Sequence, residues 1–134
     1  MFYGRNLILY LCDMELKKTL VLGASENPSR YANIAIHRLK SKGYPIVAVG
    51  YKEGSVDGVK IQKDFPTDIE VDTLTLYLSK KNQIQFYDQM IALKPKRVIF
   101  NPGTENKELE QKLTDAGIEV VPACTLVMLS TGEY

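Results

Sequence analysis

The stretch that decides the fold is TLVLGASENPSRYANIAIHRLKSKGYPIVAVG, residues 19–50. Its first four residues are a β-prone run, and the turn formers GASENP follow directly. Apolar residues then recur at helical spacing, which predicts a helix with Ser29 as its N-cap and Gly43 as its stop signal. Residues 44–49 are almost entirely apolar, as is typical of a parallel strand covered on both faces. The stretch therefore predicts a strand–helix–strand unit.

The rest of the chain repeats this alternation. Such units are joined by right-handed crossovers, which build a parallel sheet with helices on both faces. The prediction is α/β: a single Rossmann-like domain with an open, mostly parallel sheet. We expect further strands at 59–61, 72–78, 97–100 and 118–121, helices at 82–93 and 105–116, a loop at 54–58, and an unassigned apolar tail at 124–130.

The first residues differ from this pattern. Residues 7–12 form an apolar run that Asp13 ends, shorter than the apolar region of a signal peptide and without a small-residue cleavage site after it. Met14 stands just before the lead-in to the first strand. We therefore expect residues 1–13 to be an N-terminal extension or a mis-called start, and residues 14–134 to form the domain.

Composition and charge exclude several classes of function. The 134 residues include 17 Lys and Arg and 16 Asp and Glu, so the net charge is +1 with the single histidine neutral. We expect no nucleic-acid partner, because no overall field would concentrate DNA or RNA. We also expect no membrane partner, because no apolar run approaches the roughly 20 residues that span a bilayer.

The few cysteines and the single histidine limit the chemistry. Cys12 and Cys124 lack the CxxC spacing and are too few to hold a small fold together, which favours a reducing cytoplasm. A hydrolase triad or a zinc site needs more of these groups than the chain supplies. His37 lies away from the apolar stripe of its helix, so we expect it to face solvent or a partner.

Ligands of open parallel sheets bind beyond the carboxyl ends of the strands, so the residues that follow each strand are the candidates. Gly23, Ala24 and Ser25 follow the first strand, and Arg30 stands where the helix begins. Backbone N–H groups, a hydroxyl and a guanidinium suit a phosphate or diphosphate. The alternative is a plain strand-to-helix turn. Neither GxGxxG nor GxxxxGK[ST] is present, which disfavours a standard dinucleotide fingerprint and a P-loop.

The second strand ends with Gly50, Tyr51, Lys52 and Glu53. An NAD site usually carries an acid here, about 20 residues beyond the glycine motif, but Glu53 lies farther along and follows a lysine. Lys52 favours a phosphorylated ribose over a bare diol. A solvated loop lysine explains it equally well.

The run VLGASENPSRYANIAIHRLKSKGYPIVAVGYK resembles the CoA-binding domain family of small bacterial proteins, whose domain also occurs in succinyl-CoA synthetase and ADP-forming acyl-CoA synthetases. The specific part is G-A-S-x-x-P-x-R, which includes Pro28, together with the G-Y after the first helix. The likeness continues through VDTLTLYLS, FNPGTENKELEQKLTDAGIEVV and Cys124. It implies a Rossmann-type fold that binds coenzyme A, with the diphosphate near the first loop.

The resemblance implies a role for each matching position. The sequence departs from the family pattern at two places. One is at Gly50 and Tyr51, where the family often has V-N-P, and the other is after Phe100, where the family often has an aromatic-x-Gln. The implied contacts are Gly23, Ala24, Ser25 and Arg30 on the phosphates, Val49, Gly50 and Lys52 beside the adenosine, Leu78 and Ser79 in the same crevice, and Asn101, Pro102 and Gly103 facing the pantetheine arm.

Cys124 follows the last strand, where its thiol could form a mixed disulfide with the thiol of coenzyme A. The favoured alternative is a small buried hydrophobe. Ile34 is expected to be exposed on the first helix and gives a weak indication of a homodimer.

The prediction is a cytoplasmic protein that binds coenzyme A or an acyl-CoA as a non-catalytic or regulatory module. Two alternatives stay open. One is an NAD(P)-binding Rossmann enzyme, and the other is a subunit that completes an acyl-CoA synthetase in trans with an ATP-grasp partner.

Overall fold

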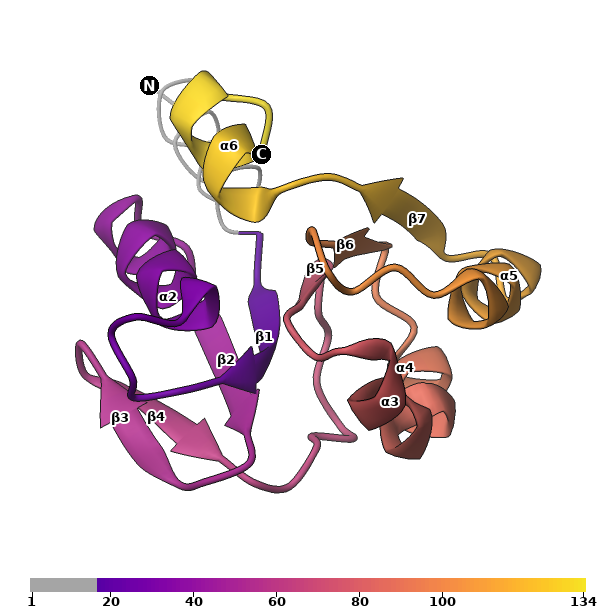
Figure 1. Ribbon diagram of the computed structural model, residues 1–134, viewed down its shortest axis with the longest axis horizontal. Helices are drawn as coiled ribbons and strands as arrows, with labels where there is room; N and C mark the ends of the chain where they lie inside the picture. Colours follow the sequence, from indigo (N-terminus) through magenta and orange to yellow (C-terminus); the bar gives the residue numbers. More distant parts are fainter. Residues whose placement is uncertain (1–16) are drawn as a thin grey trace, which may run out of the picture.

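A seven-stranded sheet forms the centre of the computed structural model, which describes residues 17–134 (Figure 1). The strand order is β3-β4-β2-β1-β5-β6-β7, and every neighbouring pair is parallel except β3 with β4. The strands are β1 (Thr19–Ala24), β2 (Ile46–Gly50), β3 (Gly54–Val56), β4 (Val59–Gln62), β5 (Thr73–Leu76), β6 (Arg97–Phe100) and β7 (Glu119–Pro122). The helices are α2 (Tyr31–Ser41), α3 (Lys80–Gln83), the 3-10 turn η1 (Ile84–Phe86), α4 (Tyr87–Leu93), α5 (Lys107–Asp115) and α6 (Thr125–Thr131).

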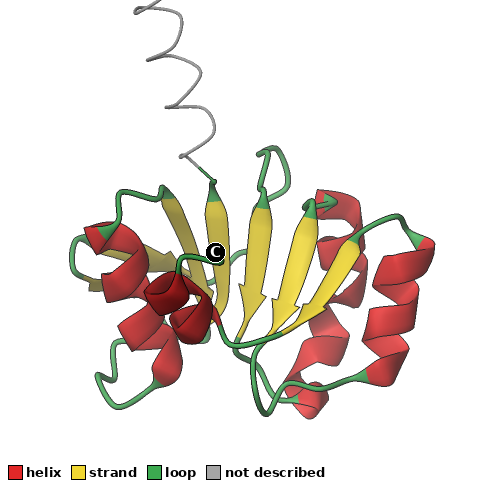
Figure 2. Ribbon diagram, turned by 90° about the horizontal axis from the view of Figure 1, so that it is seen from above, coloured by secondary structure: helices red, strands yellow, loops and turns green. Residues whose placement is uncertain are grey.

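Helices cover both faces of the sheet, α2 and α6 on one and α3, α4 and α5 on the other (Figures 1 and 2). Alternation along β1 supplies both cores: Leu20 and Leu22 join the core under α4 and α5, and Val21 joins the core under α2 and α6. Both faces of the central strands are therefore buried, which explains their apolar composition. The predicted α/β architecture is confirmed.

The first crossover is as predicted, but its helix begins one residue later than expected. Arg30 is the N-cap of α2, and Ser29 is not. The reason is Asn27, whose side-chain Oδ1 accepts hydrogen bonds from the Ser29 amide at 3.0 Å and from the Ser29 hydroxyl at 2.7 Å. Because its hydroxyl bonds to Asn27, Ser29 belongs to the turn that precedes the helix.

The predicted loop at 54–58 is wrong, because these residues begin a β-hairpin. Strands β3 and β4 pair antiparallel, with Val56 opposite Val59. Asp57 and Gly58 form the turn, with φ angles of 51° and 81°. An Asp-Gly pair with positive φ at both positions is the preferred two-residue hairpin turn, so this dipeptide was a readable signal.

Two further predictions need correction. The single helix expected at 82–93 is divided into α3, η1 and α4, and the side chain of Gln83 turns inward at the division. The unassigned tail at 124–130 is largely helix α6, whose first amide, that of Thr125, donates to Asn101 Oδ1 at 2.9 Å.

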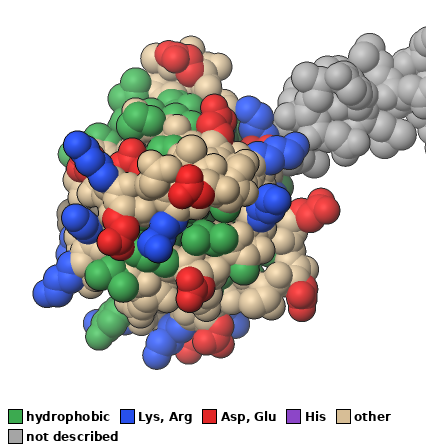
Figure 3. Space-filling view, turned by 90° about the vertical axis from the view of Figure 1, so that its right-hand side faces the viewer, with side chains coloured by type: hydrophobic (Ala, Val, Ile, Leu, Met, Phe, Trp, Pro, Cys, Tyr) green, Lys and Arg blue, Asp and Glu red, His purple; other side chains and the backbone are tan. Residues whose placement is uncertain are grey.

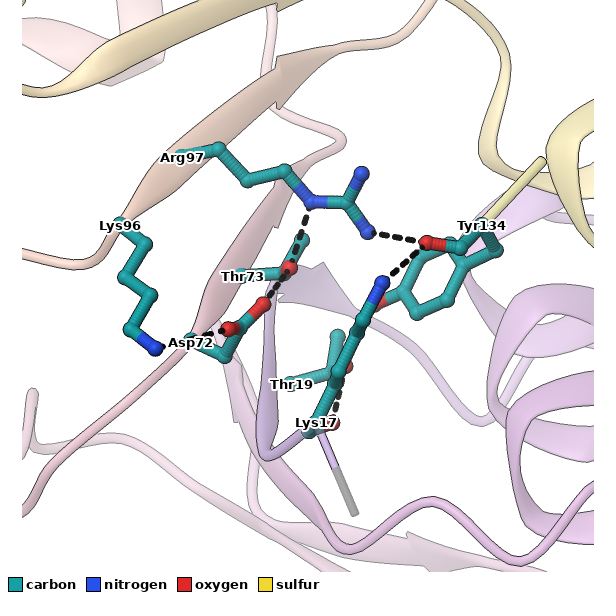
Figure 4. A network of polar contacts seen from close by, with 7 residues as sticks. All are labelled: Lys17, Thr19, Asp72, Thr73, Lys96, Arg97 and Tyr134. Carbon is teal, nitrogen blue, oxygen red and sulfur yellow. Dashed lines mark hydrogen bonds and ion pairs between the residues drawn. The ribbon is translucent and has the colours of Figure 1, made fainter. Parts of the chain in front are cut away.

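The amino ends of the central strands are closed by a polar network around Tyr134 (Figure 4). Lys17 Nζ and Arg97 Nη2 both donate to the Tyr134 carbonyl oxygen, at 2.7 and 2.9 Å, and the Arg97 guanidinium lies 4.7 Å from the Tyr134 ring centroid. The Tyr134 hydroxyl shares a 2.5 Å hydrogen bond with Thr19 at the start of β1. This network fixes the end of α6 at the edge of the sheet opposite the carboxyl ends of the strands.

Charges of both signs are mixed on the surface of the domain. On the face seen in Figure 3, Lys and Arg side chains are interspersed with Asp and Glu, without a large region of one sign. In the described part of the chain, every helix is too short or too polar to cross a membrane. The expectation that residues 1–13 are an extension or a mis-called start lies outside the described residues.

Candidate functional site

A crevice lies at the carboxyl ends of the central strands and consists of two adjoining grooves of about 790 and 770 Å³. The first groove is bounded by the β1–α2 loop and by the segments that follow β5 and β6. The second is bounded by the end of β2, the residues after it, and the 3-10 turn at Phe86. Five residues line both grooves: Gly23, Tyr51, Lys52, Leu78 and Asn82.

Two glycines allow the strand ends to approach closely beneath the crevice. Gly23 has a φ of 103°, and a Cβ there would lie 3.0 Å from the carbonyl carbon and oxygen of Tyr77. A Cβ on Gly50 would lie only 2.3 Å from the Ala24 carbonyl oxygen. Both positions therefore need glycine, for reasons of backbone packing that hold without any ligand.

The start of α2 presents unpaired backbone donors to the first groove. The N–H groups of Arg30 and Asn33 bond to backbone carbonyls, but those of Tyr31 and Ala32 have no acceptor in the part of the chain that the structure describes. The loop is held in place by the buried Asn33 side chain, which donates to the Ser25 carbonyl at 3.0 Å. Two free amides at the positive end of a helix dipole form a favourable place for an anion.

Charged side chains of both signs surround these amides. Arg30 and Lys52 line the first groove, and Lys52 also lines the second, together with Lys63. All three are exposed, so they can move to meet a phosphate. Glu26 and Glu53 line the same crevice and would repel one. Charge alone therefore does not make the crevice an anion site; the backbone donors are needed as well.

The opposite wall rests on a buried network of side-chain amides. Gln83 Nε2 donates to the carbonyls of Leu78 and Thr104, both at 2.8 Å. Asn106 Nδ2 donates to Gln83 Oε1 at 2.8 Å and to the Tyr87 hydroxyl at 2.7 Å. Through these bonds the loop after β6 and the start of α3 form one rigid surface.

The structure brings together most of the residues predicted for the site. Pro28, Asn101 and Cys124 line neither groove. The first groove holds Gly23, Ala24, Ser25, Arg30, Lys52, Leu78, Ser79, Pro102 and Gly103, and the second adds Val49 and Gly50.

The three residues outside the grooves have other positions. Asn101 is buried, and its side chain bonds to Leu76, Thr75 and the Thr125 amide, so it joins β5, β6 and α6. Pro28 lies exposed in the turn before α2. Cys124 is a half-buried free thiol and the N-cap residue of α6, and it is not the fully buried hydrophobe that was favoured.

Two predictions about the exposed side of α2 have different outcomes. His37 faces solvent as expected, with its side chain 53% exposed and its Nδ1 3.5 Å from Asp57 Oδ2. Ile34 is half-buried and not exposed.

Sequence reasoning gave no site role to several residues that line the crevice. Tyr31 and Tyr51 are 70% and 88% exposed, and both line the first groove. Their signal was positional, because Tyr51 directly follows β2 and Tyr31 begins the helix. Asn82 and Thr104 gave no such signal, because their helix and loop meet only through the network around Gln83.

Tyr77 is the strongly perturbed titratable group near the crevice. Burial raises the pKa of Tyr77 from its ordinary value of 10.0 to about 12, against the opposing effect of the nearby Thr75 and Thr125 hydroxyls. The hydroxyl oxygen is buried and has no partner at hydrogen-bond geometry in the described part of the chain. Within residues 17–134 no three His, Cys, Asp or Glu side chains gather as metal ligands. The groups that the crevice offers to a ligand are the two free amides at the start of α2 and the exposed cations Arg30, Lys52 and Lys63.

The strand order reverses at this crevice, since β2 and β5 lie on opposite sides of β1. Open α/β sheets bind nucleotides at such a switch point. The fold, with a crevice at this position, thus defines a Rossmann-like α/β domain. A family model described as CoA binding domain matches residues 17–130. The chain belongs to this CoA-binding domain family.

Solved structures of similar proteins share this fold. One is the crystal structure of an uncharacterised protein whose sequence is 54% identical. The match covers 89% of this chain and 98% of that protein, with a TM-score of 0.85. A hypothetical protein from Pyrococcus horikoshii OT3 is 26% identical over 92% of this chain and 89% of its own, with a TM-score of 0.79. A comparison with curated proteins found no match.

A larger enzyme shares the fold. It is a dinucleotide-forming acetyl-coenzyme A synthetase 1 from Ca. Korarchaeum cryptofilum, 17% identical, with a TM-score of 0.68. The match covers 84% of this chain but 27% of the synthetase, so the domain corresponds to one part of that enzyme.

Proposed function

We propose that the chain binds coenzyme A or an acyl-CoA in the crevice and performs no chemistry by itself. The observation that carries this proposal is the pair of free amides at Tyr31 and Ala32, beside Arg30, in a member of the CoA-binding domain family. A diphosphate needs donors and compensating charge at one point, and this is where the crevice offers both.

The two grooves divide the ligand between them in this proposal. The diphosphate lies at the start of α2, and the adenosine lies in the second groove beside Val49 and Gly50. Lys52 and Lys63 are the cations available there for a 3′-phosphate. The pantetheine arm follows the first groove towards Pro102 and Gly103.

A binding role agrees with the chemistry of the lining. The charged groups in the grooves are exposed, and the buried hydroxyl of Tyr77 is kept neutral at physiological pH. We propose that the protein acts in the cytoplasm, where coenzyme A is available, as a carrier or regulatory module. A homodimer stays a prediction, although the half-buried Ile34 no longer supports it.

The test is a calorimetric titration of the purified protein with coenzyme A, with 3′-dephospho-CoA and NAD⁺ as comparators. We expect coenzyme A to bind in the micromolar range and the other two to bind more weakly. Tighter binding of NAD⁺ would replace the proposal by an NAD(P)-dependent enzyme. Absence of binding by all three ligands would contradict the proposal.

A second candidate function is that of a subunit completing an acyl-CoA synthetase in trans. Its support is the fold shared with the Korarchaeum synthetase, of which this domain matches 27%. The missing activity would come from an ATP-grasp partner. ATP-dependent thioester formation after mixing the two proteins, and not with either alone, would favour this function.

A further inference from the structure

The loop of residues 51–53 contributes to both grooves but has few contacts of its own. It joins β2 to β3 and carries Tyr51, which is 88% exposed, and Lys52. Both residues line the first and the second groove. The position of this loop therefore decides where Lys52 stands relative to a ligand.

Glycines flank the loop, and both pack against the β1–α2 loop. At Gly50 the space for a Cβ is taken by the Ala24 carbonyl. At Gly54 it is taken by the carboxylate of Glu26, whose Cδ would lie 2.3 Å from a Cβ. Glu26 Oε2 accepts a hydrogen bond from the Ser55 amide at 3.0 Å. The Glu26 carboxylate thus lies against the backbone at the far end of the loop.

The turn end of the β3–β4 hairpin is held by α2, the helix that follows the β1–α2 loop. Asp57, in the hairpin turn, forms an ion pair with Lys40 of α2 at 3.8 Å and lies 3.5 Å from His37 Nδ1, and Lys40 also donates to the Asp57 carbonyl. The hairpin is therefore anchored to α2 at its turn and to the β1–α2 loop by Glu26. Glu26 itself has no cation within 4.0 Å among the described residues, so its bond to Ser55 accounts for its position.

We propose that Glu26 is a positioning residue: its carboxylate anchors the start of β3 and thereby fixes the 51–53 loop, with Lys52, at the side of the crevice. This explains an acid beside a site that favours anions. The consequence for ligand choice rests on the proposed function, since it assumes that Lys52 pairs with the 3′-phosphate of coenzyme A. Fixing Lys52 in advance lowers the ordering cost of that pair and raises the preference for coenzyme A over 3′-dephospho-CoA.

Three variants separate the anchor from the charge of Glu26. Gly54→Ala keeps the charge but displaces the carboxylate, and it is mild because the displaced group is a flexible side chain and Gly54 does not have positive φ. Glu26→Ala removes both anchor and charge. Glu26→Gln removes the charge and keeps an oxygen acceptor for Ser55. Glu108→Ala, an exposed glutamate on α5, is the matched control.

The first measurement is amide hydrogen exchange of the ligand-free protein, which does not depend on what the crevice binds. We expect exchange of the Ser55 amide to quicken by about tenfold or more in Gly54→Ala and Glu26→Ala, less in Glu26→Gln, and not at all in Glu108→Ala. Unchanged exchange in the first two variants would overturn the anchor. The melting temperature of each variant shows that it is folded.

The second measurement is the ratio of the affinities for coenzyme A and 3′-dephospho-CoA. We expect the ratio to fall several-fold in Gly54→Ala and Glu26→Ala and to be kept in Glu26→Gln, which should bind both ligands more tightly because a repelling charge is gone. Faster exchange with an unchanged ratio would overturn the positioning role. If the wild-type protein binds neither ligand, the proposed function fails. The hydrogen-exchange result then still tests, by itself, whether Glu26 anchors the start of β3.

Discussion

The two walls of the crevice are built in different ways. The wall formed by α3 and the β6–α5 loop rests on Gln83 and Asn106, whose side chains are 0% and 1% exposed and fully hydrogen-bonded. The rim formed by the β1–α2 loop is held by bonds of Asn27 and Glu26 that are exposed to solvent. Buried bonds are costly to break, whereas exposed ones exchange readily with water. The wall should thus support the fold, whereas the exposed bonds of the rim should position the ligand-facing loops and add little to the stability of the fold.

Asn106→Ala should give the largest effect, because it breaks the wall. The change leaves Gln83 Oε1 without its donor and removes the N-cap bond to the Leu109 amide. A lost cap and an unsatisfied buried group together cost about 3 kcal/mol of unfolding free energy. Urea denaturation checks this value. A loss below about 1 kcal/mol would mean that the network adds little to stability.

Arg30→Glu should weaken ligand binding at the rim and leave the stability of the fold unchanged. Arg30 is exposed, so we expect little change in stability, but reversing its charge beside the free amides should weaken coenzyme A binding by about 2–3 kcal/mol. Titration of the variant measures the effect. Arg38→Glu is the control, since Arg38 is exposed at the other end of α2 and lines neither groove. Equal affinities for both variants would remove Arg30 from the site.

Tyr77→Phe tests the junction between wall and rim, where β5 ends against Gly23. Because the Tyr77 hydroxyl is buried without a partner, its removal should leave stability at pH 7 unchanged or raise it by about 1 kcal/mol. The folded-state pKa of about 12 lies above the ordinary value of 10.0, so the wild-type protein keeps this group's contribution below pH 10 and loses it as the pH rises towards 12.

The measurement is the urea midpoint of Tyr77→Phe and of the wild type from pH 7 to pH 11.5. The variant should lose less stability above pH 10. Some loss should remain, because burial also raises the pKa of Tyr134. Identical profiles for the two proteins would show that Tyr77 ionises as easily in the folded state as in the unfolded state.

Asn27→Ala should give the smallest effect on stability and sharpens the contrast with Asn106→Ala. It deletes the same side chain from the exposed rim, where its bonds to Ser29 are worth no more than about 1 kcal/mol. We expect a shift in the urea midpoint near the limit of measurement. A loss of unfolding free energy as large as that of Asn106→Ala would remove the distinction between the buried wall and the exposed rim.

The contrast also explains how much of the fold and the site could be predicted from the sequence. The β1–α2–β2 crossover was readable because its evidence is local: apolar periodicity, turn formers and a glycine stop. The first-loop residues of the site followed from the same segment. Of the β3–β4 hairpin, the strand at 59–61 was predicted, but β3 was missed although the Asp-Gly turn is local, because β3 has only three residues.

The rest depends on contacts between residues far apart in the chain. The family resemblance implied that Asn101 faces the pantetheine arm, but its side-chain amide is used by Thr75 and Thr125, 26 and 24 residues away. Helix α6 begins at that same contact. Asn82 and Thr104 belong to segments that the buried side chain of Gln83 joins. Neither the apolar periodicity nor a short motif predicts hydrogen bonds between residues so far apart in the chain.

We propose that the ligand binds between a rigid, buried wall and a rim that exposed bonds hold in position and that binding protects further. The most direct test is amide hydrogen exchange of the wild-type protein with and without saturating coenzyme A. We expect slower exchange at residues 25–32 and 51–55 on binding, and little change at residues 104–109, whose amides should already exchange slowly. Protection confined to the opposite edge of the sheet, around Tyr134, or no protection at the rim despite saturation, would contradict the account.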